Sequence, residues 1–232
     1  MLLRSVALGD GSVVHAAFSL RQDGDFALDP EGDFVVGPAP PGVGPSGAYT
    51  WLRQVHGATV VIVDAPGEQC GAPADAAVTS CMDAPLTIRT ADCAPIAIYS
   101  SNGVLGAVHA GWHGLVVGVV AECADAMRAL GALDLRAIVG PCIHAECYEF
   151  GRDDLASVIA VVGDRAVGVT RDGAVAMDLP AAVASALQRA GVEVADRIDQ
   201  CTACCSQEYF SHRARAERER HVMVLWRAQA SR

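Results

Sequence analysis

Short apolar runs of strand length, separated by turn-forming residues, are the feature that most limits the fold of this chain. Runs such as 58–64, 85–89, 95–99 and 221–226 are rich in β-branched and other apolar residues, as buried strands are. Helical stretches are few, and they do not alternate with the strands as a βαβ repeat requires. The pattern therefore predicts an α+β fold with mixed sheets and helices outside them.

Turn signals define where several of these strands end. Asn102-Gly103 lies between two apolar runs, and Arg171-Asp172-Gly173 lies between two more, so each pair predicts a β-hairpin. A strand is expected over 12–19. The segment 29–47 is crowded with Gly and Pro and is expected to be a loop. The run 58–64 is expected to be a buried strand.

Helical periodicity is clear in three stretches, 115–130, 153–162 and 178–190. The first begins soon after His109, and its start at Gly111 offers unpaired backbone N–H groups to an anion. The two Asp residues that open the second stretch are expected to cap it. Asp178 is the expected N-cap of the third.

Length and charge restrict the class of protein. The 232 residues are 52% hydrophobic, which predicts a globular chain with one domain over 1–232. A net charge of −10 argues against nucleic-acid binding, and the Arg-rich segment 211–220 is interrupted by Glu and is interpreted as a solvated face. All 17 basic residues are Arg, which excludes a Schiff-base lysine and a P-loop. The apolar runs are too short for a membrane span.

The nine cysteines are scattered, and the first residues do not resemble a secretory signal, so we expect a cytoplasmic protein without a disulfide framework. Most cysteines, such as Cys81 and Cys123, are expected to be small buried residues. The group Cys201-x-x-Cys204-Cys205 can bind metal, but one such motif without a partner pair is weak. We interpret it as a structural loop.

The candidate site consists of His56, Cys93 and His109, each expected at the edge of a strand. Two imidazoles and a thiolate can hold a divalent metal and leave a fourth position for water. The spacings of 37 and 16 residues match no short zinc motif. From the residues alone, buried structural histidines and a core cysteine are therefore the favoured alternative.

A resemblance to a known family changes this balance. In order along the chain, seven short motifs resemble those of the YfiH family, long called polyphenol oxidase or laccase-domain proteins: Gln54–Gly57, Thr90–Cys93, His109–Trp112, Gly140–Ile143, Cys147–Glu149, Cys201–Thr202 and Phe210–Ser211. The resemblance implies a layered α-β-β-α sandwich. It also implies that His56, Cys93 and His109 bind a metal, usually zinc, with copper as the alternative.

The activities that the resemblance implies are phosphorolysis of purine nucleosides (adenosine, inosine and 5′-methylthioadenosine) and adenosine deamination. The partners would then be a nucleoside and phosphate, and the protein a monomer or homodimer. Arg53, His113 and the helix start at Gly111 are candidates for holding phosphate. Asp92 is a candidate base or a simple turn-former, and Glu149 is a second candidate base.

The chain also departs from the family pattern. His113 stands where the family usually has Arg, and the segment after 18–21 lacks the family's Asn-Arg helix. The closing Arg elements reduce to Arg213 and the region of Arg218 and Arg220. These departures concern the phosphate and substrate contacts, for which the candidates are Arg53, Asp92, His113 and Arg213. They leave the three predicted metal ligands intact.

Three alternatives accompany this interpretation. A multicopper oxidase needs about ten His and Cys ligands with closely spaced His pairs, which seven histidines without a His-x-His motif do not supply. A metal-free cysteine hydrolase would use Cys93 as nucleophile and His109 as its base. A non-catalytic metal-binding or interaction protein is the third.

Overall fold

Two mixed β-sheets form the centre of the computed structural model, which describes residues 1–29, 32, 34 and 37–230. The five-stranded sheet has the order β1-β2-β13-β6-β3, with strands Leu2–Ala7, Ser12–Phe18, His221–Gln229, Leu86–Thr90 and Thr50–Trp51. The six-stranded sheet has the order β12-β9-β7-β8-β5-β4, with strands Glu193–Arg197, Arg136–Val139, Ala94–Tyr99, Leu105–Ala110, Ala76–Thr79 and Val60–Ile62. Each sheet combines parallel and antiparallel pairs, as expected.

Five α-helices occur within the described residues: α1 (Trp112–Val116), α2 (Val119–Ala129), α3 (Arg152–Val162), α4 (Leu179–Arg189) and α5 (His212–Arg215). Three 3-10 turns, η1 (Arg21–Asp23), η2 (Ala145–Cys147) and η3 (Asp164–Ala166), and a hairpin of β10 (Val167–Val169) and β11 (Val175–Met177) complete the elements. The α+β prediction is confirmed.

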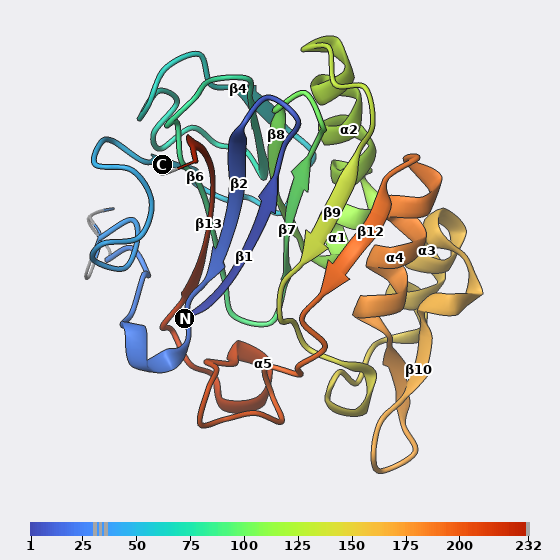
Figure 1. The fold of residues 1–232 in the computed structure, drawn as a ribbon. Coiled ribbons are helices and arrows are strands. Elements are labelled where there is room, and N and C mark those ends of the chain that lie inside the picture. Colours follow the sequence, from blue (N-terminus) through green and yellow to red (C-terminus); the bar gives the residue numbers. More distant parts are fainter. Residues whose placement is uncertain (30–31, 33, 35–36, 231–232) are drawn as a thin grey trace.

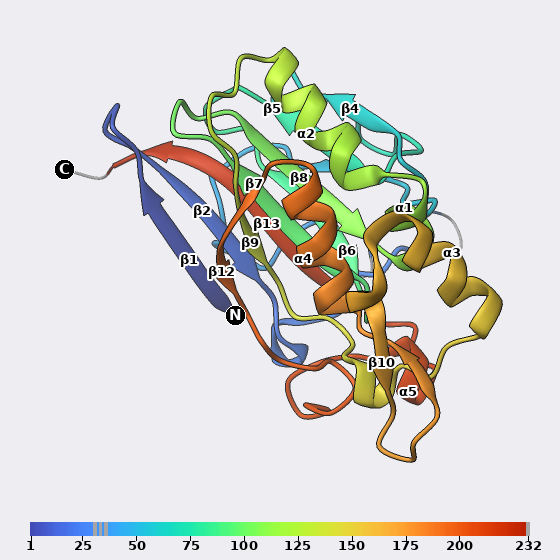
Figure 2. The ribbon, with the colours of Figure 1, turned by 90° about the vertical axis from the view of Figure 1, so that its right-hand side faces the viewer.

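The elements stack in layers (Figure 1). The two sheets face each other across a core that includes Phe18, Leu86, Ala107 and Met223. Helices α1, α2 and α4 cover the outer face of the six-stranded sheet, with α3 packed on α1 and α4 (Figure 2). Because the two sheets share one core, they form one packed unit; the assignment of all 232 residues to one domain stays a prediction.

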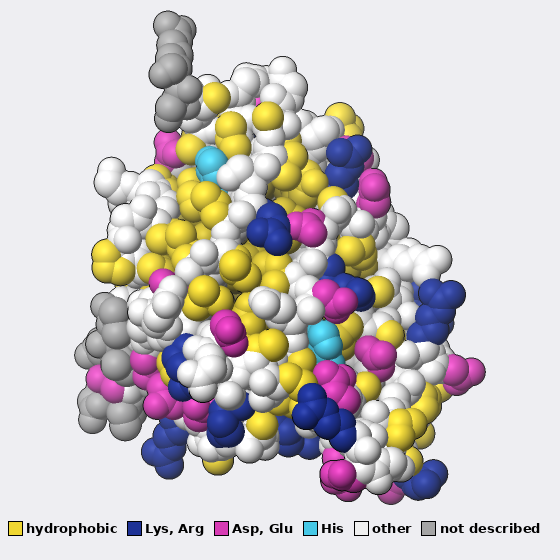
Figure 3. Space-filling model, turned by 60° about the horizontal axis from the view of Figure 1, so that its bottom comes forward, with side chains coloured by type: hydrophobic (Ala, Val, Ile, Leu, Met, Phe, Trp, Pro, Cys, Tyr) yellow, Lys and Arg dark blue, Asp and Glu magenta, His cyan; other side chains and the backbone are white. Residues whose placement is uncertain are grey.

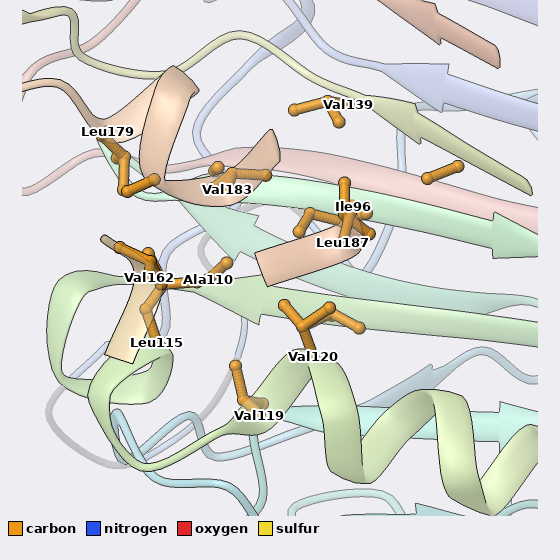
Figure 4. Close-up of a cluster of buried hydrophobic side chains, with 14 of the residues drawn as sticks. Ile96, Ala110, Leu115, Val119, Val120, Val139, Val162, Leu179, Val183 and Leu187 are labelled. Atoms are coloured by element: carbon orange, nitrogen blue, oxygen red, sulfur yellow. The ribbon is translucent and has the colours of Figure 1, made fainter. Parts of the chain in front are cut away.

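The largest core lies between the helices and the six-stranded sheet (Figure 4). Ile96, from β7, faces Val183 and Leu187 of α4, and Val119 and Val120 come from the start of α2. Burying each of these aliphatic side chains stabilises the fold by about 1.5–3 kcal/mol. This core fixes the strand β8 and the helix α1 that follows it, which together carry the site.

The outer face of the five-stranded sheet is covered by a loop segment in place of helices. Phe26 and Val43 pack there against Val222, Val224 and Trp226 of β13. Within its described part, the segment 37–47 contains no helix or strand, as the Gly and Pro residues predict, while 30–31, 33 and 35–36 lie outside the described residues. The fourth layer of the expected α-β-β-α sandwich is thus a loop, which agrees with the missing Asn-Arg helix.

Local signals predicted several elements correctly. The hairpins at Asn102-Gly103 and Arg171–Gly173 both form. Asp178 caps α4 by accepting a hydrogen bond from the backbone N–H of Ala181 at 2.9 Å. Within the chain as described, no helix is both long and apolar enough to cross a membrane.

Four predictions of local structure were wrong. The helix expected over 115–130 is broken at Gly118, whose left-handed φ of 88° separates α1 from α2. The N-cap of α3 is Gly151, and the two Asp residues lie in the first turn without a capping hydrogen bond. The strand expected over 58–64 is only β4, at the edge of its sheet, where Ile62 is 44% exposed. Of the nine cysteines, only three are buried; Cys123 is one of them, but Cys81 is partly exposed.

The segment 211–220 is only partly the solvated face that was expected. Arg215 is half-buried and donates to the carbonyls of Thr202, Ala203 and Tyr209, and its Nε lies 2.9 Å from the Glu217 carboxylate. Basic and acidic side chains are interspersed on the face drawn in Figure 3. The segment is therefore an integrated part of the fold.

His221 is buried at the start of β13, and burial lowers its pKa from 6.5 to about 4. Because its ring Nε2 accepts a hydrogen bond from the backbone N–H of Phe210, the folded state favours the neutral imidazole. The unfolded state therefore binds more protons between pH 6.5 and 4. The stability that the neutral His221 contributes is therefore fully present above pH 6.5. About 3 kcal/mol of the free energy of unfolding is lost as the pH falls toward 4.

We expect the His221→Gln variant to lose less stability than the parent chain between pH 6.5 and 4. The measurement is the free energy of unfolding by denaturant at several pH values in both proteins. Groups that titrate identically in both proteins cancel in the difference. Parallel curves for the two proteins would contradict the assignment of this pH dependence to His221.

Candidate metal centre and two adjoining clefts

Asp75, the residue just before β5, organises the centre of the site. Its side chain is fully buried, and its carboxylate accepts hydrogen bonds from the backbone N–H groups of Val55, His56 and Gly57 at 2.7–3.1 Å. His56 adopts a left-handed φ of 58° in this loop. The three hydrogen bonds from consecutive residues hold that loop, and hence His56, against the end of the six-stranded sheet.

Asp75 also orients His109, which lies at the end of β8. The Nδ1–H of His109 donates to Asp75 Oδ1 at 2.8 Å, and the backbone N–H of His109 donates to the Asp75 carbonyl at 2.8 Å. Burial alone would lower the pKa of His109, but the Cys93 thiolate and the Asp75 carboxylate outweigh it and raise the pKa to about 9. The other ring nitrogen, Nε2, bonds Cys93, and a metal bound there would take the place of its proton, as in carboxylate–histidine–metal arrangements.

Cys93 follows a strained turn between β6 and β7. Asp92 lies in this turn; it is buried and has a left-handed φ of 93°. Its Oδ1 accepts from the Thr202 hydroxyl at 2.6 Å, and its Oδ2 accepts from the backbone N–H of Arg213 at 2.7 Å. Because both oxygens are engaged, the geometry favours a positioning role for Asp92 over that of a base.

The three predicted ligands converge. One side-chain donor atom from each of His56, Cys93 and His109 lies within 4.8 Å of the others, and the two imidazole centroids are 4.8 Å apart. His109 is buried, Cys93 is half-buried and His56 is exposed. The cluster therefore has one buried and one exposed imidazole, so it is accessible from one side.

The backbone of Gly111 lies against this cluster. A Cβ placed on it would lie 3.0 Å from Cys93 Sγ and 3.0 Å from His56 Nδ1. Its φ of −86° and ψ of 168° are accessible to any residue, so the constraint is steric. A side chain at this position would therefore crowd two of the predicted ligands.

We expect Gly111→Ala to lower the zinc affinity of the cluster by about tenfold or more, on the scale of other changes next to metal ligands. The methyl group displaces either the thiol or the imidazole from its place. Competition with a chromophoric chelator measures the affinity. Gly9→Ala is the control, because a Cβ there meets no atom within 4 Å. Equal affinities in Gly111→Ala and the parent would contradict the steric argument.

A cleft with a volume of about 460 Å³ opens on one side of the cluster. We call it the Arg-lined cleft, because Arg53, Arg89, Arg218 and Arg220 line it together with the three predicted ligands. Burial lowers the pKa of Arg89 to about 10, which leaves it charged at neutral pH. Within the described chain, no side-chain partner is found for Arg53, so its guanidinium is available to an anion.

A second cleft of about 510 Å³ adjoins the cluster and shares His56, Ala91, Cys93 and His212 with the first. We call it the aromatic cleft, after Trp112, His113 and Tyr148. The rings of Trp112 and His113 stack with centroids 3.5 Å apart, and the Arg213 guanidinium lies 4.7 Å from the centroid of the Tyr148 ring. Flat apolar surfaces of this kind accept the face of a planar ring.

The other predicted residues fall on different sides of the centre. Arg53 lines the Arg-lined cleft, whereas His113 and Arg213 line the aromatic cleft. The expectation that Arg53 and His113 hold one phosphate together stays a prediction. Glu149 is exposed and is not among the residues that line either cleft, which disfavours it as a base. Helix α1 has only five residues, so its dipole adds little to anion binding.

Sequence reasoning missed Asp75, Arg89 and the packing role of Gly111. Asp75 left one signal in the sequence, since it is a charged residue directly before a short, mostly apolar strand. No local pattern in the sequence indicated the role of Arg89, because its neighbours in the cleft, Arg218 and Arg220, are more than a hundred residues away in the chain.

Comparison with known proteins gives the family. Residues 42–228 match the family described as "multi-copper polyphenol oxidoreductase laccase", the laccase-like YfiH proteins. This chain is a member of the YfiH family. The match covers all three predicted metal ligands and the residues of both clefts except Ala27 and Leu28.

Relatives of this YfiH-family chain carry the name purine nucleoside phosphorylase. One from Streptomyces coelicolor is 36% identical over 80% of this chain and 77% of its own length. One from Xylella fastidiosa is 37% identical over 76% of this chain and 71% of its own length.

Solved structures share the fold. YfiH of Bacillus licheniformis superimposes with a TM-score of 0.76 at 20% identity, covering 92% of each chain. YlmD of Geobacillus stearothermophilus gives a TM-score of 0.73 at 22% identity, covering 94% of this chain and 92% of its own.

The donor set of the cluster fits a zinc ion. Two imidazoles and a thiolate are standard ligands for zinc, and a carboxylate partner on one of the histidines is the usual outer contact. Metal ligation by His56, Cys93 and His109 remains a prediction. A multicopper centre has less support, because His56-Cys93-His109 is the only group of potential ligands with histidines that the described residues form.

Proposed function

We propose that this protein is a zinc-dependent purine nucleoside phosphorylase acting on adenosine, inosine or 5′-methylthioadenosine. The observation that carries the proposal is the position of the His56-Cys93-His109 cluster between a cationic cleft and an aromatic one. A nucleoside has a planar base on one side of its ribose. Phosphorolysis needs phosphate on the other side, so the two clefts match the two reactants.

Phosphate belongs in the Arg-lined cleft. Guanidinium groups bind phosphate oxygens in bidentate fashion, and several of them offset the charge of the dianion. Among the residues that the structure describes, Arg53 has no competing side-chain partner. Arg220 Nη1 donates to backbone carbonyls of its own segment, which fix its direction. Arg53 is therefore assigned to direct contact with phosphate.

The purine belongs in the aromatic cleft, against Trp112 or Tyr148, where stacking supplies affinity without contacts specific to one purine. Phosphate oxygen then attacks ribose C1′ as the bond from C1′ to purine N9 breaks. The leaving purine needs a proton, and His113 lines the cleft that would hold it. His113 is assigned to this hydrogen bond, a role that its family counterpart Arg does not fill in the same way.

A zinc ion bound by the cluster would supply Lewis-acid chemistry between the two clefts. The chain's own residues determine where the ion would lie. Asp75 holds His109 and the loop of His56, while the hydrogen bonds to Asp92 hold the turn that presents Cys93. Copper is the alternative ion for the same ligands.

Adenosine deamination is a second proposed activity. Three protein ligands leave one position open for water, which is the arrangement of hydrolytic zinc sites. Water would add at purine C6 and ammonia would leave. The accessible side of the cluster at His56 supports this activity, which requires the purine itself to approach the ion.

The test is incubation of the metal-loaded protein with adenosine, inosine or 5′-methylthioadenosine, with and without phosphate. Chromatography resolves the free base, the sugar 1-phosphate and inosine. Phosphate-dependent release of the free base supports phosphorolysis, and inosine formed from adenosine without phosphate supports deamination. If no nucleoside reacts, the non-catalytic metal-binding interpretation takes precedence.

Arg53→Ala is expected to raise the KM for phosphate by about tenfold, because a charge-assisted hydrogen bond contributes roughly 1.5–3 kcal/mol. The bound metal and the KM for the nucleoside should change little. Arg152→Ala, which removes an exposed Arg at the start of α3, is the control. An unchanged KM for phosphate in Arg53→Ala would place the anion elsewhere.

A further inference from the structure

A second group of metal-binding side chains lies apart from the first and shares no residue with it. Glu146 and Cys147 belong to the turn η2, and Cys201 and Cys204 belong to the loop between β12 and α5. One ligand atom from each of the four lies within 4.8 Å of the others. The two segments are more than fifty residues apart in sequence, so the fold brings these groups together.

We propose that Cys147, Cys201, Cys204 and Glu146 form a second, structural zinc site. Three thiolates and a carboxylate complete the four-coordinate shell that structural zinc requires. Zinc–sulfur bonds of about 2.3 Å place tetrahedral sulfurs about 3.8 Å apart. The Sγ atoms of Cys147 and Cys204 are 3.3 Å apart, and Cys204 Sγ is 3.4 Å from Glu146 Oε1, both within a few tenths of an ångström of such a spacing. The remaining pairs of ligand atoms lie within 4.8 Å.

The surroundings of the cluster suit bound thiolates. The backbone N–H of His144 donates to Cys201 Sγ at 3.4 Å, and the Arg171 guanidinium donates to Cys204 Sγ at 3.0 Å. Hydrogen bonds from outer groups to metal-bound sulfur are a regular part of such sites. Arg171 comes from the β10–β11 hairpin and offsets part of the negative charge that three thiolates and a carboxylate leave on a divalent ion.

Metal binding deprotonates the thiols, so the proposed site would take up zinc with release of protons. Cys201 is buried and Cys204 is exposed, so an ion could reach the site from the side of Cys204.

The ion would stabilise the loop that supports the nucleoside site. Thr202 lies between two of the ligands, and its hydroxyl holds Asp92 Oδ1 next to Cys93. Arg215, from α5, donates to the carbonyls of Thr202 and Ala203. Fixing this loop on η2 therefore fixes the turn that presents Cys93.

Zinc fits this ligand set better than copper does. Cu⁺ is favoured by soft sulfur donors, whereas the Glu146 oxygen is a harder donor that zinc accepts readily. The close approach of Cys147 and Cys204 raises one competing outcome, a disulfide between them under oxidising conditions. The two outcomes are distinguishable, because a disulfide removes two of the three thiolates.

The test is metal analysis of the full chain, purified with a reductant and loaded with zinc. We expect about two zinc ions per chain, one for each group of ligands, and about one in Cys204→Ser or Glu146→Gln. Cys205→Ser is the matched control, because Cys205 lies in the same loop but outside the cluster, and it should retain two.

A spectroscopic readout keeps the test independent of folding defects in these variants and of the proposed nucleoside activity. Cys93→Ala keeps all ligands of the second site, so cobalt bound to it should show intense tetrahedral bands and thiolate-to-cobalt charge transfer. No such bands in Cys93→Ala, an unchanged zinc count in Cys204→Ser, or a Cys147–Cys204 disulfide in the reduced preparation would each overturn the second site.

Discussion

Cys93→Ala is expected to lose the ion held at the His56-Cys93-His109 cluster and to reduce nucleoside turnover by about a thousandfold or more. The thiolate is the one anionic ligand of the three, and without it two neutral imidazoles retain a divalent ion poorly. Each tenfold loss of rate corresponds to about 1.4 kcal/mol of transition-state stabilisation. A thousandfold loss therefore means that the correctly placed ion stabilises the transition state by about 4 kcal/mol. Metal analysis and steady-state kinetics on the same preparation measure both effects.

His56→Ala distinguishes the metal site from a metal-free cysteine hydrolase. In the zinc enzyme, His56→Ala loses the ion and the activity together, as Cys93→Ala does. In a hydrolase with Cys93 as nucleophile and His109 as base, His56→Ala stays active and chelators have no effect. Cys70→Ala, an exposed cysteine outside both groups of ligands, is the control and should behave as the parent does.

Local chemistry made parts of the fold predictable. Asn102-Gly103 and Asp178 define a hairpin and a helix start through backbone conformations and hydrogen bonds within a few residues. The break at Gly118 was not predictable in this way, because the apolar periodicity continues across it from Leu115 to Val119. The edge position of β4 depends on the order of strands in the sheet, which no local pattern contains.

The same distinction applies to the candidate site. The three predicted ligands come together as the motifs imply, yet the groups that hold them come from elsewhere in the chain. Asp92 is fixed by Thr202 and Arg213, both more than a hundred residues away, and the Arg-lined cleft joins Arg53 to Arg220. Motif order predicts such ligands, whereas their hydrogen-bond partners and the charge of the clefts depend on tertiary packing.

Asp75→Asn tests the most connected of these partners. The Asp75 carboxylate accepts four hydrogen bonds, three from the backbone of 55–57 and one from His109 Nδ1. An amide offers one acceptor oxygen and places N–H groups against the remaining donors. Each buried donor left without an acceptor costs about 1–3 kcal/mol, so we expect a loss of at least about 2 kcal/mol, or roughly 4–8 °C in Tm.

The same substitution should lower zinc affinity by about 10–100-fold, because the carboxylate fixes the orientation of His109 and increases its basicity as a ligand. A purely structural role would lower Tm but leave the affinity of the folded protein unchanged, so metal competition at a temperature well below the transition separates the two. Asp10→Asn is the matched control, because Asp10 is an exposed Asp whose contacts, with Ser12 and at 4.0 Å with Arg227 Nη1, lie outside the cluster. Parent-like zinc affinity in folded Asp75→Asn would show that His109 needs no carboxylate partner, and its orientation would then be set by the strand β8 alone.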